Sequence, residues 1–189
     1  MRPLRRRNYK RQRCSGWIRR RARRIRTPTA RKKNGEQATG KTRGGWNTKI
    51  HVLADGDTVI AGFLLTGGND PDAAAGRLLL ETLDPREITA DMVMARAYSD
   101  DWTRMTAWVL RYNPVVPPKQ NRKDPWPHDE ELYKKRNEVR CFFRRLKVYR
   151  AVATRYDKLD LVFSAFIWLA CLCIFLRSVT HPSIMPQLI

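Results

Sequence analysis

The alternation of apolar and polar residues predicts a β-hairpin early in the chain. In the segment NTKIHVLAD, Ile50, Val52 and, less strictly, Ala54 occupy every second position, as in a strand with one buried face. The triplet Asp-Gly-Asp at 55–57 is a turn sequence, and TVIAGFLL after it predicts a second strand. Residues 47–65 are therefore expected to form a hairpin.

Two short helices are predicted after the hairpin. Pro71 suits the first turn of a helix, with Asp70 as its cap, and the apolar spacing continues to about Leu83. The segment DDWTRMTAWVLRY predicts another helix, with Asp100 or Asp101 near its start.

Two further strands and two longer helices complete the pattern. A strand is predicted at 92–97, and a short one in NPVVPPK is ended by Pro117 and Pro118. The longest helix is expected from about Asp129 to Arg150, and the last over 157–178. The order β-β-α-β-α-β-α-α predicts a mixed α/β domain with a partly parallel sheet.

The last predicted helix contains an apolar run, LVFSAFIWLACLCIFL, of 16 residues without a charge at 161–176. A bilayer span needs about 20 apolar residues, and Asp157, Lys158 and Asp160 crowd the start of the run. A buried core helix is the favoured interpretation, with a membrane span as the alternative.

Charge divides the chain into an arm and a domain. The 189 residues include 38 Lys and Arg against 18 Asp and Glu, a net charge of +20, and the first acidic residue is Glu36. Residues 1–33 are expected to be a disordered arm that either binds phosphates or touches nothing specific. The domain is expected over 34–178 and a tail over 179–189. Such charge favours a polyanion as partner, nucleic acid or an anionic membrane surface.

Five residues of the longest predicted helix are spaced 3, 4, 3 and 4 apart: Tyr133, Arg136, Arg140, Phe143 and Lys147. This spacing places them on one helix face. Like charges on one face repel each other, so the face either is a solvated basic surface or faces phosphates.

The segment that carries this face, YKKRNEVRCFFRRLK, resembles the Tyr-(2)-Arg-(3)-Glu-(6)-Lys signature of bacterial insertion-sequence transposases of the DDE class. Three more segments resemble the same family in the family's order, so the resemblance covers about 31–176. They are KKNGEQATGKTRGGWNTKIHVLAD, NPVVPPKQNRKDPW and TRYDKLDLVFSAFIWLA.

The resemblance implies a ribonuclease-H-like fold and a metal-dependent reaction on DNA. In this family two Asp and one Glu hold two Mg²⁺ ions, hard cations that prefer oxygen ligands. The metals activate a water or a 3′-hydroxyl for in-line attack on a DNA phosphodiester.

The three ligand positions depart from the family. The signature's Glu falls at Arg140 and the second Asp at Ala95, in VMARAY. The first Asp falls near Trp17, and residues 1–35 contain no carboxylate. No catalytic residue and no metal is therefore expected. Of the signature, the resemblance implies that Tyr133, Arg136 and Lys147 remain as phosphate-facing, DNA-binding groups.

Three neighbouring carboxylates are weaker alternatives as ligands. Asp100 and Asp101 follow the end of the strand that should carry a ligand, so they reach a metal only if the loop shifts. Glu138 precedes Arg140 by two positions, roughly 200° around a helix, and is expected to point elsewhere.

The first central strand of a ribonuclease-H-like sheet is expected to be missing. The matching stretch contains Arg19, Arg20, Arg21, Arg23 and Arg24, whereas a central strand buried on both faces is almost continuously apolar. We interpret the chain as a degenerate, truncated family member whose first 33 residues are read out of the ancestral frame or are appended.

The expected function is that of a DDE-type transposase fragment in the bacterial cytoplasm, associated with the nucleoid. It would bind transposon ends or any DNA, without metal-dependent cleavage and strand transfer, and could interfere with an intact transposase. The alternatives are a non-enzymatic nucleic-acid-binding protein that acts through its arginine-rich arm and, less favoured, a membrane-attached basic protein.

Overall fold

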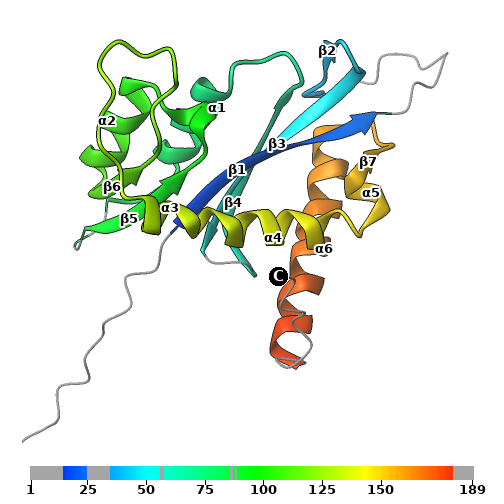
Figure 1. Cartoon of the computed structure of the whole chain (residues 1–189). Helices are drawn as coiled ribbons and strands as arrows, with labels where there is room; N and C mark the ends of the chain where they lie inside the picture. Colours follow the sequence, from blue (N-terminus) through cyan, green and yellow to red (C-terminus); the bar gives the residue numbers. More distant parts are fainter. Residues whose placement is uncertain (1–14, 25–34, 56–57, 86, 88, 181–189) are drawn as a thin grey trace, which may run out of the picture.

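The computed structural model describes residues 15–24 by their backbone, and residues 35–55, 58–85, 87 and 89–180 with their side chains. Four strands come first, and helices predominate in the second half of the chain (Figure 1). In chain order they are β1 (Ser15–Arg24), β2 (Gly40–Thr42), β3 (Gly45–Asp55), β4 (Val59–Gly67), α1 (Asp72–Glu81), β5 (Ala90–Met94), the 3-10 helix η1 (Arg96–Tyr98), α2 (Asp101–Val109), β6 (Tyr112–Val115), α3 (Glu130–Lys134), α4 (Arg136–Leu146), α5 (Arg150–Ala153), β7 (Thr154–Arg155) and α6 (Asp160–Thr180).

The strands form one mixed sheet. β3 is antiparallel to β4 and β2 along one edge and to β1 along the other. Beyond β1 the sheet becomes parallel, because β5 pairs with β1 and β6 pairs with β5. The short strand β7 also pairs with β1, further along. The predicted mixed α/β domain with a partly parallel sheet is confirmed.

The hairpin predicted over 47–65 is confirmed as β3 and β4. The alternation along β3 feeds two cores, one on each face of the sheet. Ile50, Val52 and Ala54 belong to one core, whereas Leu53 belongs to the other. A period of two sends successive side chains to opposite faces, so the pattern correctly placed Ile50, Val52 and Ala54 together. The other face is buried too, although the alternation indicated one buried face, because Lys49 and His51 are buried among polar partners.

Helices cover both faces of the sheet (Figure 1). The first core joins β3 to α4 and α6 through Val139, Phe142, Phe163 and Ile167, among others. The second core lies beneath α1 and α2. Its largest members are Leu53, Leu79, Leu80, Met92, Met94, Tyr98 and Tyr112.

The two predicted helix caps had different outcomes. The Asp100 side chain accepts a hydrogen bond from the Thr103 amide at 3.0 Å, so Asp100 caps α2 as expected. Asp70 does not cap α1, whose N-cap is Pro71. The Asp70 carboxylate accepts from the Gly67 amide at 2.6 Å instead, because the preceding turn presents that donor first.

The prediction of one continuous helix from Asp129 to Arg150 is wrong. Lys135 separates α3 from α4, and the chain turns again at 147–149 before α5. At that second turn the amides of Val148 and Tyr149 donate to carbonyls three residues back, at 3.1 and 3.2 Å. Such tight bonds end an α-helix, and the chain then changes direction.

The prediction that the sheet lacks its first central strand is also wrong. β1 spans Ser15–Arg24, inside the range expected to be a disordered arm, and pairs on both edges. Only Ser15, Gly16 and Trp17 lie between β3 and β5. The arginine-rich remainder pairs with β3 and, at its end, with the two-residue β7. Backbone groups form these ladders, so the arginines do not prevent the strand.

A buried arginine connects the start of α6 to the sheet. Arg155 is fully buried and forms an ion pair of 2.7 Å with Asp160, whose carboxylate also accepts from the Ala38 amide at 2.7–2.8 Å. Its guanidinium donates as well to the Thr48 hydroxyl and to the carbonyls of Asp157 and Lys158, at 2.8–2.9 Å. We call Arg155, Asp160 and these partners the arginine hub.

The helix α6 is buried along one stripe and exposed elsewhere. Phe163, Ile167, Ala170, Cys171 and Ile174 are buried, so the core-helix interpretation holds for that side. The helix is also long and apolar enough to cross a membrane by length and composition, although 28% of its most hydrophobic window is buried inside the protein.

Candidate functional site

The strand register brings two of the family's ligand positions together. Trp17 of β1 pairs with Met94 of β5, and Ala95 follows Met94 directly. β1 and β5 are parallel neighbours, so the two backbone positions lie side by side near the carboxyl end of β5. The frame in which two Asp side chains would meet is therefore present.

The side chain at the second of these positions, Ala95, is a methyl group. The residue is buried, with 7% exposed. The Ala95 carbonyl accepts from the Tyr98 amide at 2.8 Å, so the chain turns into η1 immediately after the strand. The position offers a metal no side-chain oxygen.

The third ligand position lies on α4, the helix that packs against β1. Arg140 is exposed and follows the buried Val139. The position that the resemblance assigns to the signature's Glu therefore lies on a helix next to the sheet, and it carries a cation.

The five residues spaced 3, 4, 3 and 4 do not share one exposed face. Phe143 is buried, with 1% exposed, and belongs to the core between α4 and α6. Arg140 and Lys147 are exposed, and Tyr133 and Arg136 are half-buried. The interruption at Lys135 places Tyr133 on a different helix from the rest, which the spacing alone did not indicate.

Tyr133 and Arg136 contact each other. The Arg136 guanidinium lies 5.7 Å from the Tyr133 ring centroid, and the His128 ring meets Tyr133 edge-on at 5.9 Å. The Arg136 Nε is buried and has no hydrogen-bond partner among the residues that the structure describes. Lys147 lies at the far end of α4, roughly 16 Å along the helix axis from Arg136.

Two of the carboxylates that could replace the missing ligands already accept hydrogen bonds. One oxygen of Asp100 accepts from Arg77 at 3.1 Å and from the Thr103 amide that it caps, whereas its Oδ1 is buried without a hydrogen-bond partner among the described residues. Asp101 accepts two hydrogen bonds of 2.5 Å from Arg122, and these hold the pKa of Asp101 below its ordinary value. Glu138 is exposed in the first turn of α4. Within the described ranges, no three His, Cys, Asp or Glu side chains form a group that could hold a metal.

An aromatic ring flanked by cations lies beside Asp101, and sequence reasoning missed it. The guanidinium of Arg104 is 3.6 Å from the Trp126 ring centroid, and that of Arg122 is 4.5 Å away. The Trp126 indole donates to the Val116 carbonyl at 2.8 Å, which ties the loop after β6 to the sheet. Burial lowers the pKa of Arg104. Because Arg104 belongs to α2 and its two partners to the loop after β6, no local spacing predicts the cluster.

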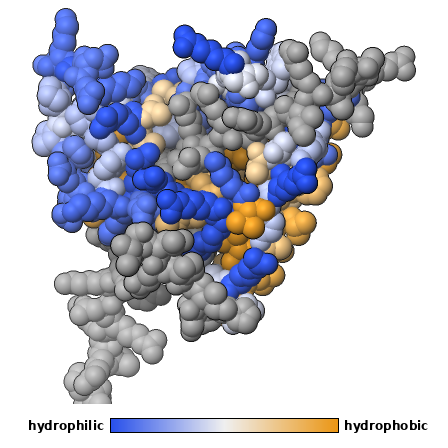
Figure 2. All heavy atoms as spheres, turned by 45° about the vertical axis from the view of Figure 1, so that its right-hand side comes forward, coloured by the Kyte–Doolittle hydropathy of each residue, from blue (hydrophilic) through white to orange (hydrophobic). Residues whose placement is uncertain are grey.

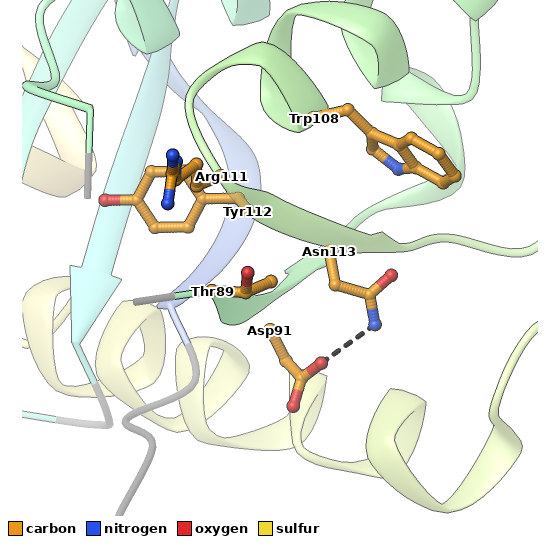
Figure 3. A pocket seen from close by; sticks show the side chains of 6 residues that line it. All are labelled: Thr89, Asp91, Trp108, Arg111, Tyr112 and Asn113. Atoms are coloured by element: carbon orange, nitrogen blue, oxygen red, sulfur yellow. Dashed lines mark hydrogen bonds between the residues drawn. The ribbon is translucent and has the colours of Figure 1, made fainter. Parts of the chain in front are cut away.

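A shallow hollow of about 480 Å³ lies at the opposite ends of the parallel strands (Figure 3). Its lining comes from the starts of β5 and β6 and the end of α2, and Asn113 donates to Asp91 at 2.9 Å across it. Because Ala95 follows the other end of β5, this hollow is separate from the ligand positions. The lining residues are Thr89, Asp91, Trp108, Arg111, Tyr112 and Asn113.

Comparison with known protein families shows to which family the chain belongs. The family described as the transposase DDE domain matches residues 22–176, most of the chain. The chain belongs to the DDE transposase family. A protein of Brucella ovis named as a transposase for insertion sequence element IS6501 is 30% identical over 131 residues, 69% of this chain and 98% of that protein. No solved structure matches the chain.

Membership in the DDE transposase family supports a role in DNA transposition, with DNA as the partner that the family implies. The family is generally Mg²⁺-dependent. The positions that the resemblance assigns to two of its ligands do not fit Mg²⁺, because Ala95 offers a buried methyl group and Arg140 a guanidinium instead of hard oxygen donors. The family match begins at residue 22, so most of β1 lies before it.

Proposed function

We propose that this transposase-family chain binds DNA and has lost metal-dependent cleavage and strand transfer. The burial of Ala95 at a ligand position carries the proposal. The exposed Arg140 can turn away from an approaching cation, but a buried methyl group cannot be exchanged for an oxygen by any rotation. The register at Trp17 supports the same conclusion, since it identifies where the partner carboxylate would lie.

The proposed fold for this activity is ribonuclease-H-like. Support comes from the strand order β4-β3-β1-β5-β6, with the first three strands antiparallel and the last three parallel. Helices on both faces of such a sheet agree with the fold that the family implies.

The proposed DNA contacts are the cations of α4 and their aromatic neighbour. Arg140 and Lys147 are exposed, and Arg136 presents a buried Nε without a partner among the described residues, beside Tyr133. Phosphate contacts by such cations release counterions, so affinity should fall steeply with salt and depend little on base sequence.

The DNA-binding half of the proposal is tested by fluorescence anisotropy with a short duplex, in EDTA and in Mg²⁺. Mg²⁺ should not strengthen binding, and it should weaken binding only as an added cation that competes for the phosphates. Lys147→Gln and Arg140→Gln should each lower the slope of log affinity against log salt by about one. Arg111→Gln, an exposed cation beside the hollow of Figure 3, is the matched control and should leave the slope unchanged. Equal effects of all three would refute the α4 surface.

The catalytic half is tested by restoring the ligands. Trp17→Asp, Ala95→Asp and Arg140→Glu combined should create Mn²⁺ binding that calorimetry detects, while the unaltered chain binds none up to millimolar concentration. The uncharged triple Trp17→Asn, Ala95→Asn and Arg140→Gln controls for packing. Stoichiometric Mn²⁺ binding by the unaltered, folded chain would refute the loss of the site. Failure of a folded, restored variant to bind would refute the frame.

A second candidate is a nucleic-acid-binding protein that acts through its basic N-terminal segment, which the composition favours. β1 belongs to the sheet, so deleting all of 1–33 would remove a central strand. Deleting 1–14, which contains seven Lys and Arg, is the appropriate variant. A collapse of the salt slope in this variant would favour the segment over α4. We further propose that the chain interferes with an intact transposase and is located at the nucleoid. Both proposals depend on DNA binding.

A further inference from the structure

The solvent side of α6 carries a second apolar stripe, distinct from the stripe in the core, and its member Trp168 also packs on Phe63 of β4 with 5.1 Å between the ring centroids. Leu161, Trp168, Leu172, Phe175 and Val179 are exposed to 81, 49, 53, 42 and 62%, and Ala165 is exposed between them. We call these six residues the outer seam. Figure 2 shows apolar side chains gathered along the side of the molecule where α6 lies, next to hydrophilic surface.

The outer seam has the spacing of a helix-packing surface. Its members are separated by 4, 3, 4, 3 and 4 residues, which is the heptad pattern of helices that pack along their length. The buried stripe follows the same spacing on the opposite side, through Phe163, Ile167, Ala170 and Ile174. One stripe already packs inside the protein, and the other has the form of a surface that packs against a helix.

The exposed apolar area is too large for an isolated soluble chain. Nine large apolar side chains of α6 are at least 39% exposed. Together they expose on the order of 800 Å², which is what each partner buries in an interface of standard size. Five of the nine belong to the outer seam, and the other four, Val162, Phe166, Leu169 and Leu176, flank it. A monomer seldom exposes a patch above roughly 600 Å². The C-terminal turns of α6 also extend beyond α4 (Figure 1).

We propose that the outer seam binds the outer seam of a second copy of this chain, with the two α6 helices antiparallel. A two-fold axis on the outer seam, midway between Trp168 and Leu172, would then pair Leu161 with Val179 of the other copy, Ala165 with Phe175, and Trp168 with Leu172. The seam is symmetric about that point in sequence. The smallest member meets a large ring, so the side chains can interdigitate, and one surface serves both copies.

Charge also favours a second copy at this surface. The chain carries +20, so two copies repel each other wherever basic surfaces meet, whereas residues 161–176 have no charge. Antiparallel helices further place opposite ends of their dipoles together. A bilayer fits less well, because insertion of α6 would pull Phe163 and Ile167 out of the core that they form with Phe142 and Val139.

The first test is the mass of the full chain by analytical ultracentrifugation at high salt without DNA. The unaltered chain should sediment as a dimer and Leu172→Glu as a monomer. Leu78→Glu is the matched control, because Leu78 is a helical leucine of nearly equal exposure, 55% against 53%. Circular dichroism confirms folding of each variant. Leu161→Glu, at 81% exposure, replaces Leu172→Glu if that variant does not fold.

The second test is the direction of the helices. Chains with Leu161→Cys and chains with Val179→Cys should form disulfide-linked dimers when mixed, with the link identified by mass spectrometry of the joined peptides. Neither variant alone should give a link between like positions, because these lie roughly 27 Å apart along an antiparallel pair. The unaltered chain shows the background from native cysteines. A link at position 161 between two copies of the Leu161→Cys variant would overturn the antiparallel arrangement.

Three results would overturn the proposal as a whole. The unaltered chain could sediment as a monomer at tens of micromolar. A dimer could persist in both folded glutamate variants of the seam. The chain could instead be monomeric and float with uncharged phosphatidylcholine vesicles, with flotation lost in Leu172→Glu, in which case the occupant of the seam is lipid.

Discussion

The arginine hub and the positions that the resemblance assigns to the metal ligands are two regions where charged side chains are expected. They differ in whether the charges have partners. In the hub, the buried cation Arg155 has a carboxylate, a hydroxyl and two carbonyls within 2.9 Å. At the ligand positions, a methyl group and a cation stand where carboxylates are expected, and the nearby Asp101 is bound by Arg122. Under the proposed function, the charges that hold the fold are complete, whereas the charges that would hold a metal have been replaced.

The difference teaches that the two sets of charges are subject to separate requirements. Removing one partner of a buried ion pair leaves an uncompensated charge and unfolds many domains. Removing metal ligands from a site relieves repulsion between carboxylates, so the fold tolerates it. Under the proposed function, this family member keeps its architecture without its metal-dependent chemistry.

The largest effect should come from breaking the hub. Arg155→Met should lower the free energy of unfolding by about 3–5 kcal/mol, because Asp160 would lose its buried cation. Urea unfolding measures this loss. The control is Arg150→Met, an exposed arginine that donates to the Tyr156 hydroxyl at 3.0 Å, which should cost below about 1 kcal/mol. Equal losses in the two variants would mean that the buried hub stabilises the fold no more than an exposed arginine does.

Placing a single carboxylate back at the site should cost the next largest amount. Ala95→Asp buries a charge without a metal, and we expect a loss of about 2–3 kcal/mol in urea unfolding. Ala97→Asp, at a half-buried position two residues later, should cost less. If Ala95→Asp left the free energy of unfolding unchanged, the site would still accommodate a carboxylate without a metal. The contrast with the hub would then be weaker.

A buried polar chain beneath the site should show an intermediate effect. The two ring nitrogens of His51 lie 2.7 Å from the Tyr98 hydroxyl and 2.8 Å from the Thr66 hydroxyl. Tyr98→Phe removes one contact with little change of shape, so we expect a loss of about 1–2 kcal/mol by urea unfolding. Tyr133→Phe, on a half-buried ring, should be close to neutral and serves as control. If Tyr98→Phe lost no stability, the hydrogen bond between Tyr98 and His51 would not contribute to the free energy of unfolding.

The smallest effect should be the pH dependence of the Asp101–Arg122 pair. The hydrogen bond from Arg122 lowers the pKa of Asp101, so its contribution to stability is present above the ordinary value of 3.8. That contribution is lost as the pH falls through the lowered pKa. Asp101→Asn should therefore be slightly less stable than the unaltered chain at pH 7, and the difference should vanish in acid. Urea midpoints between pH 7 and 2.5 measure it, and a constant difference would contradict the assignment.

Local pattern in the sequence predicted much of the fold. The period of two in β3 and the cap at Asp100 depend on neighbouring residues, so they could be read directly. β1 could not, because its arginines argue against a buried strand while its partners β3, β5 and β7 lie far along the chain. The burial of Phe143 and the interruption at Lys135 escaped prediction because tertiary packing, rather than helical spacing, decides them.

The site was predicted in a different way. The identities of Ala95 and Arg140 as ligand positions came from the resemblance to a family, and the strand register then placed Trp17 beside the first of them. The engagement of Asp101 by Arg122 joins residues 21 positions apart, and the path of the loop after β6 decides whether that arginine also stacks on Trp126. Rules based on helix and strand spacing predict contacts between near neighbours in the sequence, and not these contacts.

The pairing of β1 also governs how the chain can fold during synthesis. β1 is synthesised before the other strands that the structure describes, yet Arg23 and Arg24 pair with Thr154 and Arg155, about 130 residues later. The sheet cannot be completed until nearly the whole domain has been made. Contacts of such long range slow folding and leave apolar strands exposed meanwhile. Survival of the nascent chain should therefore depend on chaperones more than its final stability suggests.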